Sequence, residues 1–187
     1  PTQEQVDAFL PPYEPRQVLD PTDPVSIGAM VGPEAFSEVR YLAHAKQMQA
    51  LELIPKLAAQ FKTIFGRDSG GLTHSYFTDD AETIVVAMGS ILGTIKDVVD
   101  EMRQAGEKIG VLGIISYRPF PLEEVRKALQ NAKRVVVLEK SLAVGIGGVV
   151  SPDRRIAMSG LQLEGHTVVA GLGGRPITKK SLHALFA

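Results

Sequence analysis

From about residue 79 onward, short apolar runs alternate with stretches of helical spacing. The runs are rich in valine and isoleucine, as strands buried on both faces of a sheet are. Four such strands are predicted, over residues 82–88, 108–117, 134–140 and 166–174. Apolar residues between them recur every three or four positions and predict intervening helices. Strands separated by helices imply an α/β fold with an open, mainly parallel sheet, right-handed crossovers and flanking helices.

Turn and cap residues mark where the first two of these helices begin and end. The first follows Ser90, whose hydroxyl is expected to cap it, and it ends at Gly106. The second is predicted over residues 122–131. Inward-facing positions are expected to be apolar: Leu92, Ile95, Val98, Val99 and Met102 in the first helix, and Leu122, Val125 and Leu129 in the second.

Two further features follow the third predicted strand. A glycine-rich loop over residues 145–151 could open another helix. A closing helix is predicted over residues 177–186, with Thr178 as its N-terminal cap.

The first 78 residues have a different pattern. Residues 1–33 are rich in proline, which fixes φ and removes a backbone donor, so an extended arm or linker is predicted there. Residues 34–78 are predicted to form a helical segment and a glycine-rich connection, in which Pro55 starts a second helix or kinks the first. Residues 79–187 are predicted to form the α/β domain. One apolar face is expected along the helical segment: Ala35, Phe36, Val39, Leu42, Ala43, Leu53, Leu57, Phe61 and Ile64.

The composition excludes several classes of site. The 187 residues include 20 Lys or Arg and 21 Asp or Glu, so the formal net charge of −1 gives no basic footprint for nucleic acid or an anionic membrane. The absence of cysteine excludes disulfides, thiolate zinc sites, cysteine nucleophiles and iron–sulfur ligation by this chain. No apolar run approaches a membrane span and no signal peptide opens the sequence, so a cytoplasmic protein is expected. Because the sequence opens on Pro1, we expect a fragment or one domain of a longer subunit.

The step from strand to helix at Gly89 and Ser90 is the first candidate for a binding site. Backbone amides at a helix N-terminus bind anions, and a strand that feeds a helix through a Gly-Ser turn is a common phosphate cradle. No Gly-Lys-Ser or Gly-Lys-Thr follows, however, so nothing else resembles a phosphate-binding loop. A structural helix cap is therefore favoured over an anion site.

Two glycine loops fail the test for a dinucleotide-binding fingerprint. That fingerprint needs Gly-x-Gly-x-x-Gly directly after a strand. Val150 and Pro176 stand where the third glycine would be in residues 145–150 and 171–176. Tight turns and close packing are the favoured interpretation of these glycines.

Charged residues in loops form a second set of candidates. Arginines beside glycine or proline can clamp a phosphate or carboxylate, or form ion pairs with a partner chain, and the partner is favoured. These arginines are Arg67, Arg118 and Arg175. A further group ends the third strand at the carboxyl edge of the sheet, where open α/β sheets bind ligands, although a structural role is favoured for it. This group is Glu139, Lys140 and Ser141.

The remaining titratable residues indicate no catalytic constellation. Three carboxylates before the first strand could form an acid–base pair but fit a solvated turn better: Asp79, Asp80 and Glu82. The four histidines have no further ligand at metal spacing: His44, His74, His166 and His183. No catalytic and no metal-binding residue is therefore predicted, and Gly89, Ser90 and Arg118 remain as candidates for an anion site.

Four stretches, in their order, resemble a known family. They are "PPYEPRQVLDPTDPVSIGAMVGP", "IFGRDSGGLTHSYFTDDAETIVVAMGSILGTIKDVVDEMRQAGEKIGVLGIISYRPFPLEEVRKAL", "RVVVLEKS" and "VVAGLGGRPIT". Together they resemble the C-terminal part of the alpha subunit of 2-oxoacid:acceptor (ferredoxin) oxidoreductases, of which pyruvate:ferredoxin oxidoreductase is the best-known member. The resemblance covers nearly the whole chain, and residues 89–129 are its most specific part. The segment "SLAVGIGGVVSPDRRIAMSGLQLEGHT" departs from the family's pattern and leaves the substrate open.

This resemblance implies a transketolase C-terminal-like domain with a mainly architectural role. Members decarboxylate a 2-oxoacid on thiamine diphosphate with magnesium, pass electrons through [4Fe-4S] clusters to ferredoxin or another acceptor, and mostly transfer the acyl group to coenzyme A. The resemblance implies that other domains or subunits bind these cofactors and that the isolated chain is inactive. The implied partners are the thiamine-binding N-terminal domain of the alpha subunit and the beta, gamma and delta subunits.

Two alternatives stay open. A beta-type subunit of a thiamine-dependent 2-oxoacid dehydrogenase, or a transketolase relative, would normally carry a different sequence around Arg118 and Pro119. A free-standing anion- or nucleotide-binding module would bind a phosphate ligand without partners, and Ser90→Ala or Arg118→Ala would abolish that binding.

Overall fold

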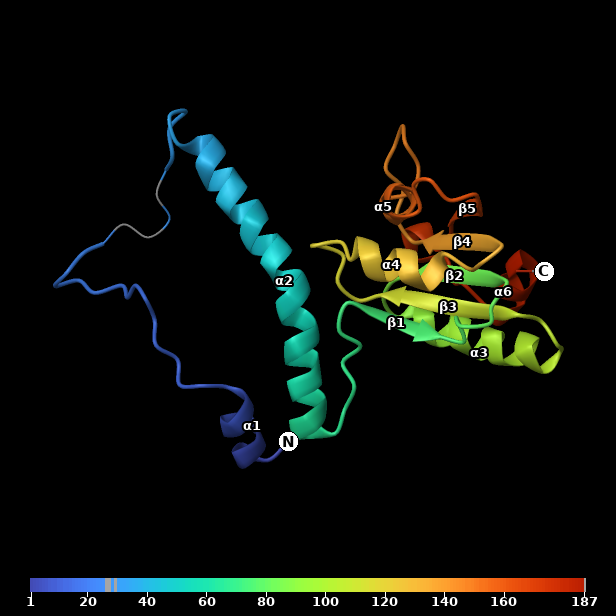
Figure 1. Cartoon of the computed structure of the whole chain (residues 1–187), viewed down its shortest axis with the longest axis horizontal. Coiled ribbons are helices and arrows are strands. Elements are labelled where there is room, and N and C mark those ends of the chain that lie inside the picture. The colour runs from blue at the N-terminus through green and yellow to red at the C-terminus, as the bar shows by residue number, and fades with distance from the viewer. Residues whose placement is uncertain (26–27, 29, 187) are drawn as a thin grey trace. The chain divides into compact units, whose positions relative to one another are not determined.

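A computed structural model describes residues 1–25, 28 and 30–186 of the chain. The chain divides into two compact units, Pro1–Ser69 and Gly70–Ala187 (Figure 1). Helices α1 and α2 belong to the first unit. A five-stranded sheet with helices on both faces forms the second unit.

A short helix, α1, opens the first unit at Gln3–Phe9. Its N-terminus is a capping box, in which Thr2 and Gln5 each accept a hydrogen bond from the backbone amide of the other. The ring of Phe9 meets two aromatic rings of α2 edge-on, those of Phe61 and Phe65. The expectation of an extended arm is therefore wrong over these residues, and the Thr-x-x-Gln spacing was the signal for a helix. Residues 26, 27 and 29 of the predicted arm lie outside the described residues.

α2, Phe36–Phe65, is a single helix of 30 residues. It confirms the predicted helical segment. It continues through Pro55, so of the two alternatives predicted for that proline, a second helix or a kink, the second helix does not form. None of its residues is buried, and several members of the predicted apolar face are exposed: Phe36, Val39, Leu42, Leu53 and Leu57. Neither α2 nor any other described helix combines the length and apolar content that a membrane span needs.

The sheet of the second unit has the strand order β1-β3-β2-β4-β5. Four parallel strands confirm the four predicted ones: β2 (Thr83–Ala87), β3 (Ile109–Ile114), β4 (Arg134–Glu139) and β5 (Glu164–Val169). The inner strands β2, β3 and β4 are buried almost throughout, which explains their unbroken apolar runs. The predicted α/β class with a mainly parallel sheet is confirmed.

β1, Thr73–Tyr76, is a strand that the sequence did not predict. It lies at the edge of the sheet and pairs antiparallel with β3, with Thr73 opposite Ile114. Its sequence, "THSY", holds no apolar run because a short edge strand buries little side-chain surface.

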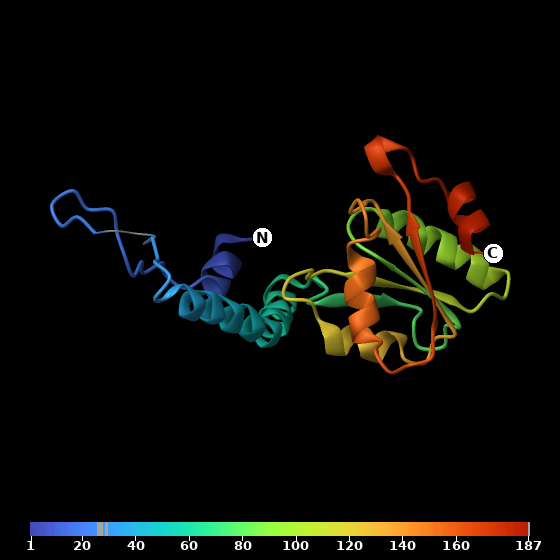
Figure 2. The same ribbon diagram turned by 90° about the horizontal axis from the view of Figure 1, so that it is seen from above.

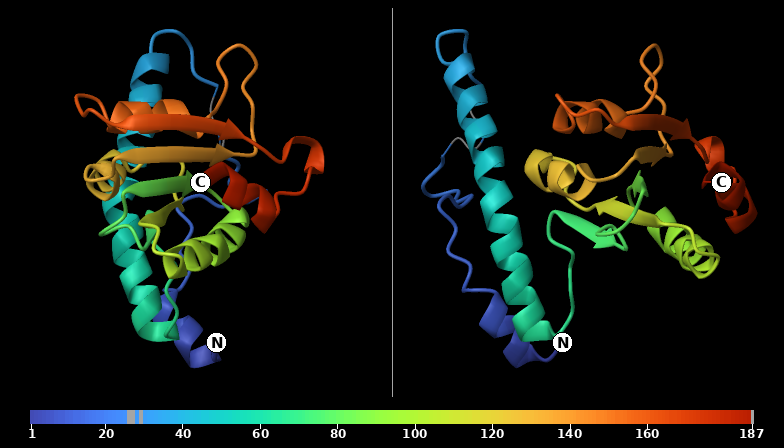
Figure 3. Two further views of the ribbon diagram at one scale, coloured as in Figure 1. Left: turned by 90° about the vertical axis from the view of Figure 1, so that its right-hand side faces the viewer. Right: turned by 45° about the vertical axis from the view of Figure 1, so that its right-hand side comes forward.

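Two helices cover each face of the sheet, and the strands supply alternate residues to the two cores (Figures 2 and 3). α3 (Ile91–Gln104) and α6 (Lys179–Phe186) pack on one face. α4 (Leu122–Leu129) and α5 (Val150–Ala157) pack on the other. α5 therefore fulfils the expectation that the glycine-rich loop opens another helix.

Two of the three expected helix ends form as predicted. At the C-terminus of α3, Gly106 has a φ of 92°, and the amide of Glu107 donates to the carbonyl of Met102 at 3.0 Å. At the start of α6, Thr178 Oγ1 accepts a hydrogen bond from the Ser181 amide at 3.2 Å.

Two local predictions in the second unit are wrong. Ser90 holds the N-cap position of α3, but its side chain makes no cap hydrogen bond. A capping residue needs extended backbone angles, whereas Ser90 has φ −62° and ψ −22°, which are helical. Leu122 was expected to face inward, but it is 39% exposed at the first position of α4, while Val125 and Leu129 are buried as predicted.

Candidate functional site

The carboxyl ends of the four parallel strands bring most of the predicted candidates to one edge of the sheet. Open α/β folds bind ligands at this edge. In chain order the residues at or beyond the strand ends are Gly89 and Ser90, Arg118, Glu139 with its neighbours, and Arg175.

The guanidinium of Arg118 is held by residues of its own chain. Its Nη2 lies 3.0 Å from Asp153 Oδ2, and its Nη1 donates to the carbonyl of Tyr117 at 2.8 Å. The guanidinium also lies over the ring of Tyr117, 4.1 Å from the ring centroid. Burial of the Tyr117 side chain raises the pKa of its phenol. In the described structure none of the hydrogen bonds of Arg118 goes to Gly89 or Ser90. No hydrogen bond therefore links Arg118 to the other two candidates, and an anion site formed by the three residues stays a prediction.

Gly89 and Ser90 form an open helix start. Gly89 has a φ of 75°, a conformation that glycine adopts without strain, and its carbonyl accepts from the Leu92 amide at 3.2 Å. Ser90 is exposed and does not cap the helix. An anion-binding role for these two residues stays a prediction.

Glu139 is a buried carboxylate whose oxygens are fully engaged. It is 4% exposed and accepts hydrogen bonds from the amides of Val149 and Val150, each at 2.6 Å, and of Ser151 at 3.1 Å. Ser151 Oγ donates to the same carboxylate at 2.5 Å and accepts from Thr167 Oγ1 at 2.8 Å. Glu139 therefore caps α5 from outside that helix, and this supports the structural role favoured for it over an acid–base role.

Gly148 makes room for this cap. A Cβ on Gly148 would collide with Glu139 Oε1 and would come within 2.9 Å of Ser151 Oγ. The last glycine of "GIGG" is thus needed because a carboxylate from another element occupies the space beside it. The sequence gives no local signal for this contact, since Glu139 lies on the preceding strand.

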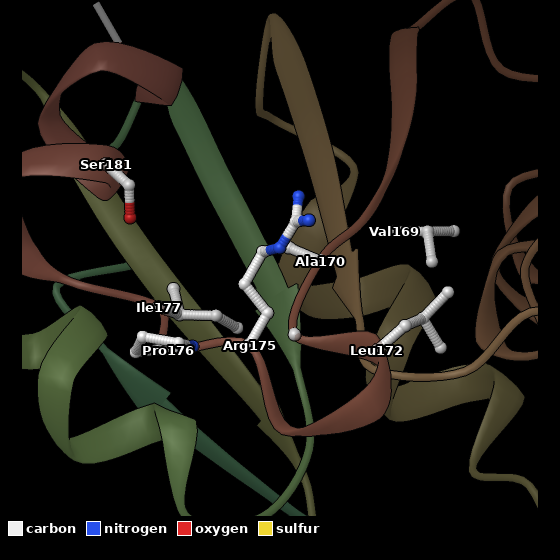
Figure 4. A pocket seen from close by; sticks show the side chains of 8 residues that line it. Val169, Ala170, Leu172, Arg175, Pro176, Ile177 and Ser181 are labelled. Atoms are coloured by element: carbon white, nitrogen blue, oxygen red, sulfur yellow. The ribbon is translucent and has the colours of Figure 1, made fainter.

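A hollow of about 460 Å³ opens beyond the end of β5 (Figure 4). It is lined by Val169, Ala170, Gly171, Leu172, Arg175, Pro176, Ile177 and Ser181. Arg175 is exposed there and forms no ion pair within the described residues. Lys140 lies close by, because a Cβ on Gly171 would come within 3.0 Å of its Cε. The positive charges of Arg175 and Lys140 would suit a small anion, but both side chains are exposed to solvent.

The other titratable candidates lie in surface pairs. Arg103 donates to Asp80 at 2.8 Å, and this hydrogen bond lowers the pKa of the carboxyl. Lys133 does the same to Glu82 at 2.8 Å. Three histidines contact charged neighbours: His74 with Lys96, His166 with Glu164, and His183 with Glu101. Among the described residues no cluster of histidine or acidic side chains could hold a metal ion.

The second unit matches a known family. Residues 81–182 match the family model of pyruvate:ferredoxin oxidoreductase core domain II. The chain belongs to this family. The match covers more than half of the 187 residues and confirms the resemblance drawn from the sequence.

Curated relatives match nearly the whole chain. Pyruvate synthase subunit PorA of Methanosarcina barkeri is 44% identical over 185 residues, which are 96% of this chain and 46% of that protein. Pyruvate synthase subunit PorA of Methanothermobacter thermautotrophicus is 38% identical over 178 residues, 95% of this chain and 46% of that protein. Ketoisovalerate oxidoreductase subunit VorA of Pyrococcus horikoshii is 32% identical over 186 residues, 98% and 47% respectively. The chain spans about half the length of these relatives.

Two solved structures are distantly similar. One is a 2-oxoglutarate:ferredoxin oxidoreductase from Magnetococcus marinus, with a TM-score of 0.48 and 16% identity over 68% of this chain and 20% of that chain. The other is a split-gene transketolase in an inactive beta4 tetramer, with a TM-score of 0.49 and 15% identity over 63% of this chain and 41% of that chain. Both are too distant to add to the fold described above.

Proposed function

We propose that this chain is the assembly segment of an alpha-type subunit of a 2-oxoacid:ferredoxin oxidoreductase in the cytoplasm. Such a complex oxidatively decarboxylates a 2-oxoacid, usually to an acyl-CoA, and passes the electrons to ferredoxin or a similar acceptor. The family match and the PorA and VorA relatives support this proposal. The engaged carboxylate of Glu139 supports an architectural role at the strand ends, because its acceptor sites are used within the chain.

The observation that carries the assembly role is the surface of α2. This helix has 30 residues and carries a row of large apolar side chains, yet none of its residues is buried. Leu42 is 59% exposed and Phe36 56%. A helix of this length is stable in water mainly when an apolar face packs against a neighbour. We propose that this face packs against another domain or subunit of the complex.

The cofactors of the complex are assigned to other domains and subunits. Iron–sulfur clusters are held by cysteine thiolates, and this sequence has no cysteine. Magnesium prefers carboxylate oxygens, and the described residues offer no suitable cluster of them. We therefore propose that thiamine diphosphate, magnesium, the [4Fe-4S] clusters and coenzyme A bind to the N-terminal part of the alpha subunit and to the beta, gamma and delta subunits.

Pyruvate is the first 2-oxoacid to test. The PorA relatives are 44% and 38% identical to this chain, whereas the VorA relative is 32% identical. This order favours pyruvate over a branched-chain 2-oxoacid.

The test is made on the native complex, purified without oxygen through a tag on this chain. Co-purified chains are identified by mass spectrometry, and reduction of a viologen dye is assayed with pyruvate, 2-oxoisovalerate and 2-oxoglutarate. We expect iron–sulfur subunits and activity that depends on thiamine diphosphate, coenzyme A and pyruvate. A chain that purifies alone, folded and inactive, would contradict the proposal.

Two neighbouring substitutions on α2 test the role of its apolar face. Leu57→Asp places a charge on that face, and we expect the other subunits to be lost from the purified complex. Lys56→Asp places the same side chain at the preceding position, which is exposed, and we expect the complex to persist. Equal loss with both variants would show that helix stability, and not the apolar face, was disturbed.

A further inference from the structure

β5 is an edge strand whose outward backbone groups have no strand partner. Among the strands that the structure describes, it pairs with β4 alone. The amide of Glu164 donates to the carbonyl of Lys133, just before β4, and the amide of Ala170 donates to the carbonyl of Glu139 at the end of β4. The even-numbered residues therefore face that strand. In the described part of the chain, the outward amides and carbonyls therefore belong to Gly165, Thr167 and Val169. Such an edge is a template for pairing with another extended segment.

A buried guanidinium lies on this edge strand. Arg154 of α5 is 5% exposed, although arginine is rarely buried without a partner. A Cβ on Gly165 would come within 2.6 Å of Arg154 Nη1, so the guanidinium occupies the space that the glycine leaves. Its Nε has no hydrogen-bond partner, and within the described residues no carboxylate forms an ion pair with it.

The nearest acidic residues in the sequence and the sheet are engaged elsewhere. Asp153 pairs with Arg118, Glu164 with His166, and Glu139 with the start of α5. Burial and the neighbouring charge of Arg155 lower the pKa of Arg154. A buried charge without a partner is costly to the folded state, so a carboxylate brought to this place would be bound strongly.

We propose that an extended acidic segment of another subunit pairs with the open edge of β5 and places a carboxylate on Arg154. This inference rests on the proposed assembly role of the chain. The charge of Arg154 selects an acidic partner, and the unpaired backbone groups of β5 select an extended one. Pairing would satisfy both the outward row of β5 and the guanidinium.

The geometry also fixes which side of the partner segment meets which surface. A residue directly opposite Gly165 would have its side chain on the α5 face, with its Cβ about 5 Å from the glycine, within reach of the guanidinium. The next residue would face the opposite side, where a hollow of about 310 Å³ lies beside β5 and α6. That hollow is lined by Arg134, Val136, His166, Thr167, Val168 and Leu185. We therefore expect an Asp or Glu next to an apolar residue in the partner segment.

Photo-crosslinking in the native complex tests this inference. The photoreactive residue p-benzoylphenylalanine is placed at His166, which is exposed on β5, and the tagged complex is irradiated and analysed by mass spectrometry. We expect a cross-linked peptide from another subunit that contains an Asp or Glu beside an apolar residue. Arg154→Gln should lower the cross-link yield at least about tenfold, because one member of a desolvated charge pair is removed.

Two further variants serve as a matched control and a second disruption. Arg155→Gln removes the same charge from an exposed neighbouring position and should change the yield less than about twofold. Val169→Pro removes an outward amide without touching the β4 ladder and should also lower the yield.

The outcomes separate this inference from the assembly role. If other subunits co-purify but no cross-link forms, or if Arg154→Gln leaves the yield unchanged, the inference is wrong while the assembly role stands. A cross-link to residues 10–35 of this chain, or to a second copy of it, would also overturn the assignment to another subunit. If no subunit co-purifies, the assembly role fails and this inference fails with it.

Discussion

α3 and α5 both begin just beyond a glycine, but their first backbone amides meet different surroundings. In α3, Ser90 at the N-cap is exposed and makes no cap hydrogen bond. In α5, the N-cap Val149 has no capping side chain of its own, and the buried carboxylate of Glu139 accepts from three successive amides instead.

The difference is between an open and a filled anion position. A helix N-terminus attracts negative charge through its free amides and its dipole. At α5 the chain supplies that charge from the end of β4, so an external anion there would have to displace a buried carboxylate. At α3 no side chain of the described residues caps the helix start. The anion-binding role of Gly89 and Ser90 stays a prediction, whereas the carboxylate at the start of α5 fits a structural role.

Removing the buried carboxylate gives the largest expected effect. Glu139→Ala leaves the amides of residues 149–151 and the Ser151 hydroxyl without an acceptor, and we expect it to lower the free energy of unfolding by about 3–5 kcal/mol. Urea denaturation, monitored by circular dichroism, measures the change in the free energy of unfolding. Glu139→Gln keeps the shape but presents an NH₂ group to donors, so about 2–4 kcal/mol should be lost.

Chemical rescue shows whether the charge or the packing matters in that variant. Formate should partly restore the stability of Glu139→Ala, because a small carboxylate can occupy the vacated place at the helix start. Chloride at equal ionic strength is the control. Equal stabilisation by both salts would contradict the view of α5 as a filled anion position.

Two glycine substitutions compare the packing at the two helix starts. Gly148→Ala drives a Cβ into the Glu139 carboxylate, and we expect a loss of about 1–3 kcal/mol. Gly93→Ala, in the first turn of α3, meets no atom within 4 Å and should stabilise the chain by about 0.5–1 kcal/mol, since it only removes backbone freedom. Thermal denaturation of the two variants measures both changes, and the same sign for both would contradict the comparison.

The ion pair at the start of α5 should contribute less than the buried cap. Asp153 lies in the first turn of α5 and pairs with Arg118, whose side chain is 54% exposed. Arg118→Gln should cost about 0.5–1 kcal/mol, and the cost should shrink with added salt. A double-mutant cycle with Asp153→Asn isolates the pair. A coupling energy as large as the loss in Glu139→Gln would place the main support of α5 in this pair.

The sequence predicted the strands and most helices because their signals are local. Buried strands such as β2 and β4 contain unbroken runs of apolar, mostly β-branched residues. Gly106 likewise marks the end of α3. β1 escaped prediction because four mostly polar residues on an edge form no apolar run. α1 escaped because its capping box lies in a proline-rich context that suggested an extended arm.

The site was less predictable because its contacts join separate elements. Glu139 reaches α5 across the loop 140–149, and no spacing rule links a strand-end carboxylate to a later helix start. The burial of Arg154 likewise could not be predicted, because it depends on the packing of α5 against Gly165 in a later strand. Ser90 shows the converse, since its residue type predicted a cap that its backbone angles prevent. Residue type identifies candidates, but tertiary packing decides which of them are engaged.

Ser90→Ala should give the smallest change and tests the open helix start most directly. A serine that caps a helix contributes about 1 kcal/mol, but this hydroxyl makes no cap hydrogen bond, so we expect a change below about 0.5 kcal/mol. Thermal denaturation with and without inorganic phosphate adds the functional measurement. If phosphate raises the Tm of the parent chain and Ser90→Ala removes that shift, the start of α3 binds anions through this hydroxyl. If phosphate shifts neither protein, both helix starts are structural, and they differ only in how their amides are satisfied.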